Sequence, residues 1–335
     1  MPRRRKPAMS NDELNERQHV PIPVVLDTDA GIDDAVALAL AAKSPELAVL
    51  AVTTTYGNTR LAAATRNARF VLRLAGRPDI PVFPGADAPL TRPLTTAPEI
   101  HGTEGVGDAP VPPAQQTEAI PDRRCLLNVL AAAERPVTLV TLGPLTNLAL
   151  ALSAEKDLVR TQVARHLGVF GSLRERGAAT RWADFNAWCD PDAAHLVLRA
   201  GLDTVLVGLD VTRLVVLSAT EIERLPSSPE PLVHWLGQTL RYYSESLRRE
   251  ARPSGCVVND VLPVVELVAP GTLRCSRFAL DIDLGDGEDR GRTYESPGGV
   301  PTMVATGIDV DRARRLLVRV LGEYRQDNPR SGGSA

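Results

Sequence analysis

The sequence predicts a single α/β domain built on a doubly wound, mostly parallel sheet with helices on both faces. Short apolar runs alternate with segments of helical periodicity along most of the chain. The apolar runs are continuous, which is typical of parallel strands that are buried on both faces. The length of 335 residues and the hydrophobic content of 44% are sufficient for one large core.

The first part of the chain supplies most of the sheet. Strands are predicted at residues 24–27, 47–57, 137–143, 166–172 and 204–210. Helices are predicted at residues 33–42, 60–76, 145–153 and 191–201. Strands that alternate with helices in this way pair in parallel and place helices on both sides of the sheet.

The remaining segments differ in character. Helices are predicted at 231–250, 259–269 and 310–324, and the alternating segment 278–286 predicts an edge or hairpin strand. The proline-rich stretch 86–121 predicts a long loop, which is typical of an active-site cover or a disordered segment. Residues 1–20 and 326–335 are predicted to be disordered tails around a domain at 21–325, because they contain too few apolar residues.

The net charge and the cysteine spacing indicate what kind of ligand and what cellular compartment to expect. A net charge of -3 gives no electrostatic argument for binding nucleic acid or an anionic membrane, so a small soluble ligand is expected. No apolar run reaches the ~18 residues that a membrane span requires. The four cysteines lie far apart without a C-x-x-C pair, which favours buried, reduced thiols in a cytoplasmic protein over a zinc site or disulfides.

A cluster of aspartates marks the end of the first predicted strand. The segment VVLDTDAGIDDAVALALAA contains Asp27, Asp29, Asp33 and Asp34. Ligands bind beyond the carboxyl ends of the strands in an open parallel sheet. Helix capping explains one or two acidic residues in a first turn, but four close carboxylates repel one another and favour a divalent cation bound through oxygens.

The chemistry expected at such a cluster is hydrolysis. Two carboxylates and backbone carbonyls around a cation leave room for water and for the hydroxyls of a ligand, while a further carboxylate can take a proton. Additional oxygen ligands are expected at other strand ends. Asp260 in VVNDVLP and the turn at Gly143 in VTLGPLTN are the candidates.

Seven segments carry a resemblance to a known family. They are LDTDAGIDDAVAL, VTTTYGN, HGTEGVGD, LVTLGPLTN, ADFNAWCDPDAAHLVL, VGLDVT and NDVLP, in this order. Together they resemble the inosine-uridine preferring nucleoside N-ribohydrolases over residues 22 to 322, and the fold of that family is the one inferred above. The resemblance implies hydrolysis of the N-glycosidic bond of ribonucleosides by a metal-bound water, in a cytoplasmic homodimer or homotetramer.

The resemblance also implies roles for individual residues. The metal ligands would be Asp29, Asp34, Asp260 and the carbonyl of Leu142, around one Ca²⁺ per subunit, with Asp27 supporting them and Asp29 deprotonating the water. The substrate would be bound by Asp33, Asn58, Asp184, Asn186, Tyr243 and Phe170, with His101 and Asn259 near the leaving base. Tyr242 is the alternative to Tyr243, because adjacent helical residues point in different directions.

Three positions depart from the family pattern. Asn259 stands where members active on purines commonly have a histidine, and an asparagine cannot act as an acid, so efficient purine hydrolysis is not expected. Ala178 replaces a usual sugar-binding asparagine, and Asp184 replaces a usual glutamate. These changes predict an altered pocket around the ribose 5′ position, where Arg176 or Arg181 could reach a substituent, even a phosphate.

Two alternative functions are compatible with parts of this pattern. An aspartate-nucleophile phosphatase would share the D-x-D opening, but that mechanism needs a downstream lysine, and Lys156 is the only lysine after residue 43. A nucleoside-binding or regulatory protein with weak or no turnover would explain Asn259 and Ala178. Against it, a pure binder has no need of the complete set of water-activating aspartates.

Overall fold

The computed structural model describes residues 20–113, 120–249 and 255–322. The predicted tails at 1–20 and 326–335 lie outside these ranges, apart from the exposed Val20. No helix in the described ranges has the length and apolar character to cross a bilayer.

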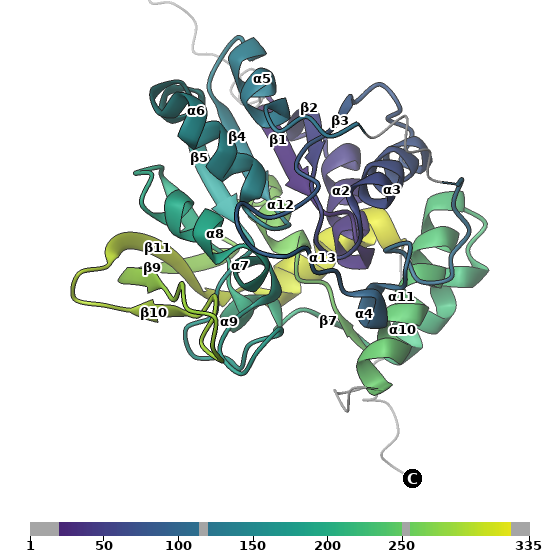
Figure 1. Ribbon diagram of the computed structural model, residues 1–335. Coiled ribbons are helices and arrows are strands. Elements are labelled where there is room, and N and C mark those ends of the chain that lie inside the picture. Colours follow the sequence, from purple (N-terminus) through teal and green to yellow (C-terminus); the bar gives the residue numbers. More distant parts are fainter. Residues whose placement is uncertain (1–19, 114–119, 250–254, 323–335) are drawn as a thin grey trace, which may run out of the picture.

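A sheet of nine strands forms the centre of the described structure, in the order β10-β9-β11-β6-β5-β4-β1-β2-β3 (Figure 1). Neighbouring strands from β11 to β3 pair in parallel, while β9 pairs antiparallel with both β10 and β11. The bounds are β1 Ile22–Thr28, β2 Leu47–Thr54, β3 Val82–Pro84, β4 Val137–Thr141, β5 Val163–Gly168, β6 Thr204–Leu206, β9 Leu273–Ile282, β10 Thr293–Glu295 and β11 Val300–Ile308. A separate antiparallel pair joins β7 (Val216–Leu217) to β8 (Cys256–Val257).

Helices cover both faces of the sheet (Figure 1). One face is packed by α2 Ile32–Lys43, α3 Leu61–Leu74, α11 Pro231–Arg249, α12 Val261–Val268 and α13 Val310–Leu321, and the other by α5 Cys125–Ala132, α6 Thr146–Gln162 and α8 Pro191–Leu198. Strand β1 serves both cores, because Val24 and Leu26 point to the first and Val25 to the second. Shorter helices are α4 Pro98–His101, α7 Phe185–Cys189, α9 Leu209–Thr212 and α10 Ala219–Arg224, with a 3-10 turn at Leu225–Ser227.

The predicted fold class is confirmed. Residues 278–282 of the predicted strand 278–286 form the second half of the longer strand β9, whereas 283–286 lie beyond its end. Strand β9 lies between β10 and β11, so β10 rather than β9 forms the edge of the sheet. The proline-rich stretch 86–121 contains the short helix α4, and its residues 114–119 lie outside the described ranges.

The strand order creates the crevice in which the candidate site lies. From β1 the chain adds β2 and β3 on one side of the sheet, and then β4, β5 and β6 on the other side. A ligand crevice is expected where the order reverses, beyond the carboxyl ends of the two adjacent strands β1 and β4. The backbone N–H of Leu142 donates to the carbonyl of Asp27 at 2.7 Å, which ties the two strand ends together there.

Candidate functional site

A tight turn connects β1 to α2 and carries the first aspartates. Ala30 has φ +43°, a left-handed conformation that is uncommon for a residue with a side chain. Its N–H donates to Thr28 Oγ1 at 3.0 Å, and its carbonyl accepts from Asn67 Nδ2 at 3.1 Å. These bonds hold the strained turn, which is therefore a fixed support for Asp29.

Asn58 joins two of the carboxylates. Its backbone N–H donates to Asp29 Oδ2 at 2.7 Å, and its Nδ2 donates to Asp29 Oδ1 at 3.1 Å and to Asp34 Oδ2 at 2.9 Å. Asp34 also accepts from the hydroxyl of Thr28 and from the backbone N–H of Gly31. The two carboxylates are thereby fixed side by side.

A compact group of carboxylates extends from this pair. Oxygens of Asp33, Asp34 and Asp260 lie within 4.8 Å of one another, and all three residues are buried. Burial raises the pKa of each of these carboxyls and of Asp29, and neighbouring carboxylates raise it further for Asp29, Asp34 and Asp260. Asp33 Oδ1 has no hydrogen-bond partner among the described residues. Crowded, buried oxygens of this kind fit a hard divalent cation.

Asp27 lies behind this group. Its Oδ1 accepts hydrogen bonds from the hydroxyl of Thr53 and from Asn147 Nδ2. Its Oδ2 has no partner within the described ranges, and burial raises the pKa of this carboxyl to about 7. Sequence reasoning did not identify Asn147, although it lies in the quoted segment LVTLGPLTN.

The carbonyl of Leu142 lies at the end of β4, beside Asn186. Asn186 Nδ2 donates to this carbonyl at 2.6 Å and to the carbonyl of Val169 at 2.8 Å, so only its Oδ1 remains for a ligand. Asp184 caps α7 and accepts from the backbone N–H groups of Gly171, Asn186 and Ala187 at 2.7, 2.9 and 3.2 Å. Burial raises the pKa of the Asp184 carboxyl to about 6.

A cavity of about 920 Å³ opens above the carboxylates. The predicted residues that line it are Asp33, Asn58, His101, Leu142, Asp184, Asn186, Tyr243, Asn259 and Asp260. Asp29 and Asp34 have no exposed surface and do not line the cavity themselves. The structure thus gathers residues from strand ends, the 86–121 loop and α11 around one space.

One wall of the cavity is aromatic. The rings of His101 and Tyr243 are stacked, with centroids 5.2 Å apart and an interplanar angle of 29°. The backbone N–H of Ile32 donates to His101 Nδ1 at 3.2 Å, which assigns the ring proton to Nε2. Burial lowers the pKa of His101 to about 4, so its ring is neutral near pH 7.

Asn259 is held between two protein groups. Its Nδ2 donates to Asp33 Oδ2 at 3.0 Å, and its Oδ1 accepts from the hydroxyl of Thr212 at 2.9 Å. Thr212 lies in the quoted segment VGLDVT, but the contact to Asn259 spans 47 residues and has no local sequence signal.

The prediction that Phe170 binds substrate is wrong. Phe170 is buried in the core between the sheet and α5, α6 and α8, and it does not line the cavity. The preceding residue, Val169, lines the cavity instead. Because successive residues of extended chain point to opposite sides, Phe170 faces away from the site.

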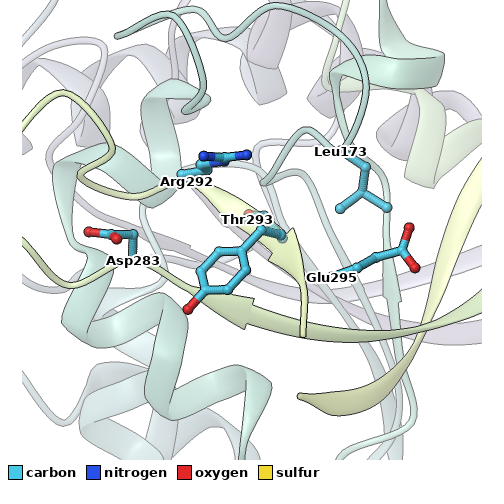
Figure 2. Close-up of a pocket in the computed structure, with 6 residues that line it drawn as sticks. Leu173, Asp283, Arg292, Thr293 and Glu295 are labelled. Carbon is cyan, nitrogen blue, oxygen red and sulfur yellow. The ribbon is translucent and has the colours of Figure 1, made fainter. Parts of the chain in front are cut away.

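A second, smaller cavity of about 470 Å³ lies beside β10 (Figure 2). It is lined by Leu173, Asp283, Arg292, Thr293, Tyr294 and Glu295. Figure 2 shows the carboxylates of Asp283 and Glu295 at opposite ends of this space. None of the predicted site residues belongs to it, so the chemistry is assigned to the larger cavity.

Comparisons with known proteins identify the family of this chain. The family model described as inosine-uridine preferring nucleoside hydrolase matches residues 24–315. The inosine-uridine preferring nucleoside hydrolase of Crithidia fasciculata is 31% identical over 312 residues, which cover 90% of this chain and 98% of that protein. The pyrimidine-specific ribonucleoside hydrolase RihA of Enterobacter sp. (strain 638) is 38% identical over 297 residues, 87% of this chain and 94% of that protein.

A solved structure supports the same family assignment. The plant nucleoside hydrolase PpNRh1 has a TM-score of 0.81 and 30% identity, covering 90% of this chain and 100% of the other. The match therefore extends over nearly the whole described fold, including the β1 and β4 ends that carry the carboxylates. The chain belongs to the inosine-uridine preferring nucleoside hydrolase family.

Proposed function

We propose that this nucleoside hydrolase cleaves the N-glycosidic bond of ribonucleosides with the help of Ca²⁺, releasing the free base and ribose or a modified ribose. The observation that carries the proposal is the buried group of Asp33, Asp34 and Asp260, with Asp29 joined to Asp34 through Asn58; Asp33 and Asp260 line the large cavity. The oxygens of this group are crowded and desolvated, and one of them, Asp33 Oδ1, lacks a partner in the described structure.

The residues present fit a divalent cation. Asp29, Asp34, Asp260 and the carbonyl of Leu142 would hold it, and Ca²⁺ accepts such an all-oxygen set. The ion would supply positive charge that makes a water molecule in the site more acidic. Asp33 and Asn186 both line the cavity, and the unpartnered Oδ1 of Asp33 and the Oδ1 of Asn186 are the proposed acceptors for sugar hydroxyls.

Asp29 is proposed as the base. The two donors of Asn58 hold both oxygens of its carboxylate, which fixes the orientation in which it takes a proton from the attacking water. Cleavage develops positive charge on the ribosyl ring, and the surrounding carboxylates stabilise that charge because they are already in place.

The aromatic wall is proposed to receive the base. Tyr243 offers a stacking surface, and neutral His101 donates only a hydrogen bond, through Nε2, to a leaving base. Asn259 is engaged by Asp33 and Thr212 and cannot act as an acid. We therefore propose that the substrate preference is altered by Asn259 and by Ala178, and that purines which need a strong acid are hydrolysed slowly.

The cellular setting is part of the same proposal. A cytoplasmic homodimer or homotetramer with one Ca²⁺ per subunit is proposed, supported by resemblance to a family whose members tend to assemble in this way. Light scattering on the purified protein measures the assembly directly. A monomer would contradict this part without affecting the proposed chemistry.

The decisive experiment measures reducing sugar released from a panel of purine, pyrimidine and 5′-modified nucleosides, with and without a chelator. Turnover should disappear with the chelator and in Asp29→Ala, and calcium should restore it only in the unmodified protein. Asp283→Ala, in the smaller cavity, is the matched control and should keep full activity. Turnover that persists in chelator would contradict the metal-dependent mechanism.

A nucleoside-binding protein with little turnover is the second candidate, favoured by the engaged Asn259. The substitution Asn259→His distinguishes the two. A gain on inosine approaching the ~10²–10⁴-fold typical of general acid catalysis would identify an active centre that lacks an acid. If no member of the panel is hydrolysed while metal and nucleoside still bind, the binding protein is the better description.

A further inference from the structure

The wall of the large cavity formed by residues 176–181, here called the loop wall, has a distinct chemistry. All six residues line the cavity. The loop wall belongs to the segment before α7, and in Figure 1 α7 and α9 lie to the left of α4 and α11, which carry His101 and Tyr243. The aromatic wall and the loop wall line the same cavity, so a ligand with its base on the first can present its sugar to the second.

The loop wall is a built structure. Asp210 accepts hydrogen bonds from three consecutive backbone N–H groups at residues 173–175, at 2.9, 2.8 and 3.3 Å. Arg213 donates to the carbonyls of Arg176 and Gly177. Two anchors on α9 and its C-terminal end thus hold the segment in place, and the role of Arg213 is to support the loop backbone.

Two guanidinium groups dominate the side chains of the loop wall. Arg176 and Arg181 lie at its ends, separated by the small side chains of Ala178 and Ala179. Within the described ranges, neither arginine forms an ion pair with a carboxylate. The Arg181 guanidinium lies over the ring of Trp182, 4.6 Å from its centroid. The wall therefore offers two positive charges that no carboxylate in the described ranges neutralises.

Asp184, which lines the same cavity three residues after the loop wall, is already engaged. Asp184 accepts three backbone hydrogen bonds, which cap α7 and fix the turn at Gly171. A neutral hydroxyl on the sugar would meet arginine donors and an acceptor that the protein already uses. An anionic group would instead meet two cations of the type that binds phosphate oxygens in pairs.

We propose that the loop wall binds a phosphate monoester on the sugar carbon that points away from the base, so that the substrates include 5′-phosphorylated ribonucleosides. The volume of about 920 Å³ is near the upper end of the ~300–1,000 Å³ typical of small-molecule pockets, which leaves room for the phosphate. Water adds to the anomeric carbon as the N-glycosidic bond breaks, the base takes a proton, and ribose 5-phosphate is released. This inference rests on the proposed hydrolase function.

The first test compares kcat/KM for uridine 5′-monophosphate and uridine, with ribose 5-phosphate identified as a product. We expect the nucleotide to be preferred. Arg176→Ala and Arg181→Ala should each reduce the nucleotide-to-nucleoside ratio about tenfold, the loss expected for one charged hydrogen bond. Arg174→Ala, in the same loop but outside the cavity lining, is the matched control and should leave the ratio unchanged.

The second test does not depend on turnover. Calorimetry with ribose 5-phosphate and with ribose, both in excess calcium, measures the contribution of the phosphate alone. Binding of ribose 5-phosphate at least about tenfold tighter than ribose, lost in Arg181→Ala, supports the loop wall as the phosphate site. Equal affinities for ribose 5-phosphate and ribose would overturn the proposed phosphate site, even if the protein hydrolyses uridine well. If neither uridine nor its monophosphate is hydrolysed, the proposed function fails for these substrates and this binding comparison still decides.

Discussion

Asn58 shows how one side chain organises the candidate site. It gives three hydrogen bonds to two carboxylates that would otherwise repel each other. Removing a donor leaves a buried carboxylate oxygen without a hydrogen bond, which lowers stability by about 1–3 kcal/mol or more for each such oxygen. The geometry of Asp29 and Asp34 therefore depends on a residue 24 positions or more away in sequence.

Replacing Asn58 with alanine should lower kcat on the best substrate by at least about tenfold, because Asp29 and Asp34 lose their side-chain donor. Release of reducing sugar measures this. The exposed Asn128, which donates to Asp122 on the surface, provides a matched control, and Asn128→Ala should retain full activity. Equal activity of the two variants would contradict the role given to Asn58.

The bridge from Thr212 through Asn259 to Asp33 predicts an indirect effect on binding. In Thr212→Val the amide of Asn259 loses its anchor, so Asp33 is held less firmly. We expect KM for the nucleoside to rise about fivefold, which corresponds to one net hydrogen bond of about 1 kcal/mol, with kcat little changed. Thr212→Ser restores the hydroxyl and should restore KM; failure of this rescue would argue against the bridge.

The turn between β2 and α3 is the element that brings Asn58 to the site. Gly57 in this turn has φ +155°, and a Cβ there would lie 2.0 Å from Asp29 Oδ2. Only glycine lets the turn pass so close to the β1 end. The close approach of two strand ends is thus a condition for the carboxylate geometry.

Gly57→Ala should displace Asp29 and reduce kcat/KM by at least about 100-fold, the scale on which loss of a general base acts. Gly76→Ala makes the same change in the turn after α3, at φ +79° and with no atom within 4 Å of the added carbon. That control should lose about 1 kcal/mol of stability to backbone strain and keep its activity. The prediction is wrong if both variants show the same kinetics.

At the scale of the whole molecule, a buried histidine couples stability to pH. His166 lies in β5 between the hydroxyls of Thr141 and Thr204, at 2.9 and 3.1 Å, and burial lowers its pKa to about 3. The unfolded chain protonates this residue below about pH 6.5, whereas the folded chain does not until about pH 3. The contribution of neutral His166 to the free energy of unfolding is therefore complete above pH 6.5 and is lost as the pH falls toward 3.

Urea unfolding of the wild type and of His166→Gln isolates this contribution, because other titrating groups are shared. Between pH 8 and pH 5 the wild type should lose about 2 kcal/mol more stability than the variant. His234→Gln, which replaces an exposed histidine, should follow the wild type. If the free energy of unfolding depends on pH in the same way in the wild type and in His166→Gln, His166 is not the source of this pH dependence.

The sequence predicted the architecture because the parallel strands are continuous apolar runs and the helices have clear periodicity. Strands β3 and β10 were not predicted, because each is a three-residue strand at an edge of the sheet without the longer apolar run that marks the equally short β6. The carboxylates were recognised because four of them are close in sequence. The contact of Asn147 with Asp27 spans 120 residues, so only the fold reveals it. Phe170 was misplaced because a one-residue shift along extended chain reverses the direction of a side chain.

The charged groups around Trp182 make its fluorescence emission sensitive to a ligand in the large cavity. Guanidinium groups of Arg181 and Arg292 lie 4.6 and 4.8 Å from its ring centroid. The emission of an indole depends on the electric field at its ring, so a ligand that draws Arg181 toward itself changes the emission of Trp182. Trp235, 3% exposed and bonded to the carbonyl of Pro110, gives a constant background, whereas Trp188 also lines the large cavity, with the Arg290 guanidinium 4.6 Å from its ring centroid. The unlabelled protein therefore carries its own fluorescent reporters of occupancy in the large cavity, and a Trp188→Phe variant restricts the signal to Trp182 at the loop wall.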